Sequence, residues 1–102
     1  MRFRRGRFAD VLDRQLVLFE RENESLLRDV EAALAAHTRA DRDEAEERYG
    51  DFLDLVETAQ DELVALRDGY AAGLDEDTAD EYRAAFNALV RKRLPRYGLG
   101  ID

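Results

Sequence analysis

The chain of 102 residues has no cysteine, a single proline and no long run of hydrophobic residues. The lack of cysteine excludes disulfide bonds and thiolate metal sites, and it fits a reducing cytoplasm. Since 39% of the residues are charged and 45% are hydrophobic, the composition favours long amphipathic helices over sheet or disorder. At this length we expect one domain, close to the size at which a partner subunit is often recruited.

Export and membrane-spanning segments are not expected. No stretch approaches the ~20 apolar residues that a spanning helix needs. An arginine pair near the start suggests export, but Asp10, Asp13 and Arg14 interrupt the apolar core that must follow in a signal peptide. We therefore predict a soluble cytoplasmic protein with no membrane span.

Charge is unevenly spread along the chain. Four arginines lie within residues 1–7 and four basic residues lie within 91–96, whereas the body between them is strongly acidic and the net charge is -8. The second basic group complements the dipole of a helix that ends there. Because no basic stripe follows any helix and the net charge repels phosphate, nucleic acid is not an expected partner.

Apolar residues between Ala45 and Tyr70 are spaced alternately by four and three positions without a miss. They are Ala45, Tyr49, Phe52, Val56, Ala59, Leu63, Leu66 and Tyr70. A repeat of about 3.5 residues keeps one stripe of a helix facing a partner helix and imposes a left-handed supercoil. This seam predicts a helix over about 41–72 that pairs along its length.

A second apolar stripe runs from Phe8 to His37 and predicts a helix over about 7–37. A helix of this length makes the molecule an elongated rod. The link at 38–40 is short, and Asp41 is a plausible cap for the next helix. The first two helices are therefore expected to form a long antiparallel hairpin.

A third, shorter helix is predicted over about 77–94. Gly73 stops the second helix, because glycine accepts the backbone conformation common just past a helix end. The new helix begins either with Asp77 as its cap or with a capping box of Thr78 and Glu81. Pro95 ends it.

The hairpin returns the chain to the start of the first helix, so the third helix must lie beside Phe8 to about Ser25. Val11 and Leu18, with the stem of Gln15 between them, offer the apolar flank that this packing needs. The predicted fold is all-α, an elongated up-down-up three-helix bundle over 7–94. A basic N-terminal arm at 1–6 precedes it, and a non-helical tail at 95–102 follows.

The far half of the hairpin, 26–37 against 45–55, is left as a two-helix stalk that cannot bury its apolar side chains within one chain. Full burial of each is worth about 1.5–3 kcal/mol, so leaving several half-exposed is costly. We therefore predict that the bundle is completed by a two-fold homodimer. The predicted interface is Leu26, Leu27, Val30, Leu34, Tyr49, Phe52 and Leu53.

Two polar residues lie on the apolar stripe of the first helix. Asn23 is interpreted as a residue that fixes helix register and partner choice, with a ligand contact or simple exposure as alternatives. The register hypothesis predicts that Asn23→Leu raises thermal stability. His37, the single histidine, suits a cation near a helix C-terminus. A metal role lacks partners, because Leu34 stands where a Glu-x-x-His motif places its glutamate.

No residue is assigned a catalytic, cofactor-binding or metal-binding role. The acidic residues flank the seam instead of facing a common pocket, and no serine or threonine has a histidine at a motif spacing. The tail is expected to fold back over apolar surface, with docking to another protein as the alternative. Residues named as partner contacts are Val17, Tyr97, Leu99 and Ile101.

The function predicted from these patterns is that of a non-catalytic structural or protein-protein interaction bundle, homodimeric, with an unidentified protein as a further partner. The alternative is a small-molecule- or metal-binding bundle with an enzymatic role. That alternative uses Asn23, His37, Tyr49 or Phe52 near the stalk.

Overall fold

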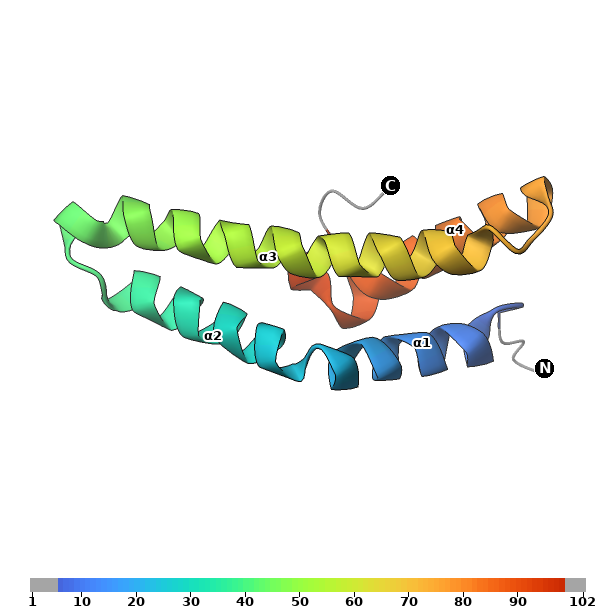
Figure 1. Ribbon diagram of the computed structural model, residues 1–102, viewed down its shortest axis with the longest axis horizontal. Helices are drawn as coiled ribbons and strands as arrows, with labels where there is room; N and C mark the ends of the chain where they lie inside the picture. Colours follow the sequence, from blue (N-terminus) through green and yellow to red (C-terminus); the bar gives the residue numbers. More distant parts are fainter. Residues whose placement is uncertain (1–5, 99–102) are drawn as a thin grey trace, which may run out of the picture.

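The computed structural model describes residues 6–98, an elongated arrangement of helices that measures 53 × 33 × 21 Å (Figure 1). In chain order these are α1 (Ala9–Glu22), α2 (Glu24–Arg39), α3 (Arg42–Ala71), α4 (Glu76–Arg93) and the 3-10 helix η1 (Pro95–Tyr97). No strand occurs within this range, so the predicted all-α class is confirmed. Nor does any helix within 6–98 have the length and apolar content needed to span a membrane.

The predicted first helix is interrupted at Asn23, so the prediction of three helices is wrong and the structure has four α-helices within 6–98. Asn23 leaves the helical conformation, with φ -114° and ψ 23°. Its backbone N–H and its side-chain Nδ2 both donate to the carbonyl oxygen of Phe19, each at 3.0 Å. A side chain that competes for a main-chain carbonyl bends a helix, and here it separates α1 from α2.

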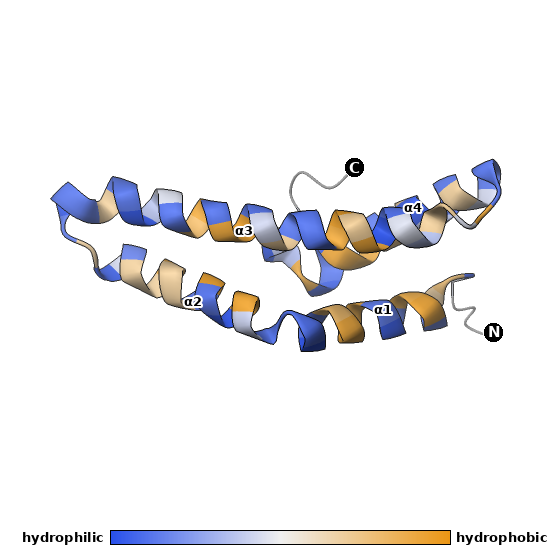
Figure 2. Cartoon of the chain, viewed as in Figure 1, coloured by the Kyte–Doolittle hydropathy of each residue, from blue (hydrophilic) through white to orange (hydrophobic). Residues whose placement is uncertain are grey.

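Helices α2 and α3 form the expected antiparallel hairpin, and hydrophobic residues gather along its middle (Figure 2). Val56, Ala59 and Leu63 of the predicted seam are buried. Further along α3, the predicted seam is wrong, because Tyr70 is 40% exposed whereas Arg67 and Ala71 are buried. A straight α-helix drifts by about 20° per heptad, and this drift turns the buried stripe from Leu63 to Arg67.

The start of α4 differs from both predicted caps. Asp75 precedes the helix, and one of its side-chain oxygens accepts the backbone N–H of Thr78 at 2.9 Å. The other oxygen accepts the Thr78 hydroxyl at 2.8 Å. Asp75, and not Asp77 or a box of Thr78 and Glu81, therefore satisfies the first turn, and these hydrogen bonds lower the pKa of the Asp75 carboxyl.

Helix α4 lies beside the first part of α1, as predicted. The rings of Phe8 and Tyr82 meet edge to face at 5.5 Å, and Arg93 forms an ion pair with Asp13. The apolar flank is smaller than expected, because Leu18 is 46% exposed.

Residues 95–98, the described part of the tail, fold back onto the middle of the hairpin. Residues Pro95–Tyr97 form a 3-10 turn, so the prediction of a non-helical segment is wrong for these residues. Tyr97 is 5% exposed, and its carbonyl oxygen accepts a 3.4 Å hydrogen bond from Gln60. The predicted contacts at Leu99 and Ile101, like most of the basic arm, lie outside the described residues.

Candidate functional site

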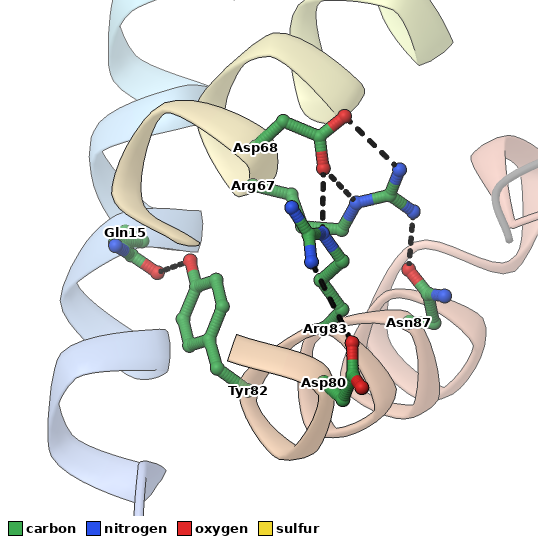
Figure 3. A network of polar contacts seen from close by, with 7 residues as sticks. All are labelled: Gln15, Arg67, Asp68, Asp80, Tyr82, Arg83 and Asn87. Carbon is green, nitrogen blue, oxygen red and sulfur yellow. Dashed lines mark hydrogen bonds and ion pairs between the residues drawn. The ribbon is translucent and has the colours of Figure 1, made fainter. Parts of the chain in front are cut away.

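A polar network joins α3 to α4 around the buried side chain of Arg67 (Figure 3). The Nε of Arg67 donates to Asp68 at 2.9 Å, and its Nη1 donates to the side-chain oxygen of Asn87 at 3.0 Å. Arg67 is 6% exposed, so its charge requires these partners. The guanidinium group thus bridges a carboxylate on its own helix and an amide on α4.

Asp68 is shared between two arginines. Arg83 on α4 donates to the same carboxylate at 3.2 Å and also lies 3.8 Å from Asp80. The hydrogen bonds from Arg67 and then from Arg83 outweigh desolvation and lower the pKa of Asp68. The carboxylate is therefore held in its charged form and ties the two helices together.

Tyr82 links α4 to α1 in the same region. Its hydroxyl donates to Gln15 at 2.7 Å, and its ring lies 4.7 Å from the ring of Tyr70. Burial raises the pKa of Tyr82 to about 12, chiefly because the phenolate would be desolvated. The phenol therefore stays protonated near neutral pH.

This network serves the fold. Within residues 6–98, no buried side-chain nitrogen or oxygen lacks a hydrogen-bond partner. General acid-base catalysis favours a pKa near the working pH, whereas the pKa of Asp68 is displaced downward and that of Tyr82 upward. The two groups fix helices α1, α3 and α4 in place.

A row of aromatic and cationic groups follows the outer half of the α2–α3 hairpin. The guanidinium carbon of Arg96 lies 5.9 Å from the ring of Phe52, Phe52 lies 6.1 Å from Tyr49, and Tyr49 lies 5.1 Å from His37. Tyr49 is 46% exposed and the neighbouring Leu53 is 44% exposed. The hairpin therefore presents apolar surface beyond the point where η1 ends.

The residues predicted to form a dimer interface fall into three groups. Val30 is completely buried in the core of its own chain, so it is not available to a second copy. Leu26, Leu27 and Phe52 are half-buried against that core, and Leu34 is also half-buried. Tyr49 and Leu53 are the exposed members.

The other predicted residues lie apart from one another. Asn23 is at the break between α1 and α2, and His37 is in the last turn of α2, where its Nδ1 lies 3.1 Å from the carbonyl oxygen of Ala45. Val17 is 43% exposed on α1, whereas Tyr97 is buried in its own chain. In the part of the chain that the structure covers, no three His, Cys, Asp or Glu residues are grouped to hold a metal ion.

A groove of about 360 Å³ between the start of α1 and the end of α4 has an apolar floor that includes Phe8, Leu12 and Leu89. The arginines at its rim are already paired, Arg7 with Glu81 at 3.0 Å and Arg93 with Asp13. These pairs stabilise the packing of α1 against α4.

Sequence reasoning missed the Arg67 network. The spacing held a signal, because Arg67 stands four residues after Leu63 and four before Ala71, which continues a buried stripe at helical spacing. The heptad pattern instead favoured Leu66, and an arginine is seldom fully buried unless it is paired. Asn87, which accepts from Arg67, and Arg83, which donates to Asp68, come from α4, and no local pattern places that helix against α3.

Comparisons with protein-family models, with curated proteins and with solved structures find no match to this chain.

Proposed function

We propose that the protein is a non-catalytic interaction bundle of the cytoplasm, and that it forms a two-fold homodimer through the open half of its hairpin. The observation that carries this proposal is the exposure of Tyr49 and Leu53 beside each other on α3, where α4 does not reach. We call this surface the stalk face; it consists of Leu34, His37, Tyr49, Phe52 and Leu53. The absence of cysteine supports the cytoplasmic location.

The stalk face has the composition of an interface centre. Aromatic residues are enriched where protein surfaces associate, because they bury large areas with few rotatable side-chain bonds. Two copies of the stalk would form a four-helix arrangement that covers Tyr49 and Leu53 from water. Closed two-fold dimers are the commonest homo-oligomers, and such a dimer uses the same surface on both copies.

Sedimentation velocity between 1 and 100 µM, roughly the range in which weak interfaces dissociate, tests the proposal. We expect a concentration-dependent dimer that Leu53→Glu converts to a monomer with an unchanged circular dichroism spectrum. Leu18→Glu is the matched control, because Leu18 on α1 is 46% exposed and Leu53 is 44% exposed. A monomeric wild-type protein throughout, or equal effects of the two substitutions, would refute the proposal.

A further inference from the structure

We infer that the two stalks pair antiparallel, so that the acidic tip of one copy lies against the basic base of the other. The inference rests on the homodimer proposed above and specifies its geometry. The acidic tip is the segment 41–51, at the turn of the hairpin and the start of α3. The basic base is the segment 91–96, where α4 ends and η1 begins against the middle of the hairpin.

The two segments carry opposite charge. Between residues 41 and 51 there are six carboxylates and two arginines, and the second of these, Arg48, lies within 3.7 Å of both Glu44 and Asp51. Between residues 91 and 96 there are four basic residues and no acidic one. Like charges placed opposite each other cost free energy, whereas complementary patches steer and orient association.

Two of the four basic residues at the base form ion pairs within their own chain. Arg93 pairs with Asp13, and Arg96 pairs with Glu31. Arg91 and Lys92 are exposed, and neither forms an ion pair with a carboxylate in residues 6–98. A guanidinium group has five N–H donors, so Arg96 can also donate to a second carboxylate.

The axial spacing fits an antiparallel pair. Helices rise by about 1.5 Å per residue, so Glu47 lies about 9 Å from Leu53 along α3. A two-fold axis near Leu53, an exposed residue of the stalk face, therefore places Glu47 of one copy opposite residue 59 of the other and about 18 Å from the partner's Glu47. The base lies at this level, since Arg96 covers Phe52 and the carbonyl of Tyr97 meets Gln60.

The stalk face connects the two charged ends without interruption. The row runs from Arg96 through Phe52 and Tyr49 to His37, with spacings of 5.9, 6.1 and 5.1 Å. An antiparallel dimer stacks two such rows head to tail and brings each tip to a base. A parallel dimer would instead place the two tips side by side, where their carboxylates repel.

Charge reversal distinguishes the two orientations. Glu46→Lys with Glu47→Lys reverses the tip, and Arg91→Glu with Lys92→Glu reverses the base; all four residues are exposed. In low salt we expect either reversal alone to weaken the dimer by about tenfold or more, and the two together to restore it. Added salt weakens the wild-type dimer. Unchanged or tighter dimers after single reversals, or a wild-type dimer that salt strengthens, would overturn the inference.

Cross-linking provides a second test that does not depend on charge, because the chain has no cysteine of its own. Glu47→Cys and Arg91→Cys proteins are oxidised separately and then as an equal mixture. We expect disulfide-linked dimers in the mixture only. Self-linking of the Glu47→Cys protein, or no link in a mixture whose members are dimeric by sedimentation, would overturn the antiparallel geometry. A monomeric wild-type protein would instead refute the dimer itself.

Discussion

The hydroxyl of Tyr82 on α4 donates a 2.7 Å hydrogen bond to the side-chain oxygen of Gln15 on α1, across 67 residues of sequence. Tyr82 is completely buried, and its ring contacts the rings of Phe8, Tyr70 and Phe86. This bond is a polar link between the first and last α-helices inside the apolar core.

Removing the Tyr82 hydroxyl therefore destabilises the fold. We expect Tyr82→Phe to lower the free energy of unfolding by about 1 kcal/mol, because a typical net hydrogen bond contributes that amount. Urea unfolding followed by circular dichroism measures it. Tyr70→Phe is the control, since Tyr70 is 40% exposed. An equal loss in both variants would contradict a specific role for the bond to Gln15.

The Tyr82 phenol makes the free energy of unfolding depend on pH in the alkaline range. The pKa of Tyr82 rises from 10.0 to about 12 on folding, so its contribution is complete below pH 10 and is lost as the pH rises toward 12. We expect the unfolding free energy of the wild type to fall across this window more steeply than that of Tyr82→Phe. Parallel curves for the two proteins between pH 9 and 12 would contradict this assignment.

Arg67 is the most consequential charged residue of the core. Truncation by Arg67→Ala leaves the Asn87 amide without its arginine partner and opens a void, so we expect a loss of roughly 2–3 kcal/mol in urea unfolding. Arg67→Lys should recover only part of it, because an ammonium group cannot reproduce the fork that reaches both Asp68 and Asn87. Arg21→Ala, at an exposed site on α1, should change stability by less than about 0.5 kcal/mol. Full recovery by lysine would show that charge alone suffices.

The substitution Asn23→Leu distinguishes two hypotheses by the sign of its effect on stability. A role in register predicts that Asn23→Leu raises stability, whereas a role in bending the helix predicts a fall. In Figure 1, α1 and α2 meet at a bend, and each helix runs closer to α3 with distance from that bend. Leucine has no donor for the Phe19 carbonyl and favours a straight helix that would carry α1 away from α4. We expect a loss of about 1 kcal/mol in thermal or urea unfolding, and a gain would support the register role.

Two glycines should respond oppositely to alanine. A methyl group at Gly98 would lie 3.0 Å from Cγ and 3.2 Å from Cα of Arg91, so Gly98→Ala must push η1 from α4 and should lower stability by about 1 kcal/mol. Gly69, exposed within α3, has no atom within 4 Å of an added methyl group. Gly69→Ala should therefore raise stability by about 0.5–1 kcal/mol through helix propensity. Differential scanning calorimetry of both variants measures the contrast, and equal signs would contradict it.

Much of the secondary structure could be predicted from spacing. The expected helix over 41–72 is observed as Arg42–Ala71, and the one over 77–94 as Glu76–Arg93. Apolar periodicity is a local property of the chain, so it predicts where a helix lies even when the partner helix is unknown. The break at Asn23 could not be predicted from spacing, because Asn23 occupies a position on the apolar stripe that a continuous helix would also bury. Only the position of its side chain, bonded back to Phe19, decides between these outcomes.

The sequence by itself determined the helical class, the antiparallel hairpin and the place of α4 beside α1, because these follow from the spacing of apolar residues and the lengths of the helices. Tertiary structure alone decided which side of the long helix is buried at its end. There the stripe passes from Leu63 to Arg67 and Ala71, while Tyr70 stays 40% exposed. The reason is physical: a helix of 3.6 residues per turn drifts away from a heptad, and Asn87 on α4, together with Asp68 on α3, supplies the hydrogen bonds that allow Arg67 to be buried.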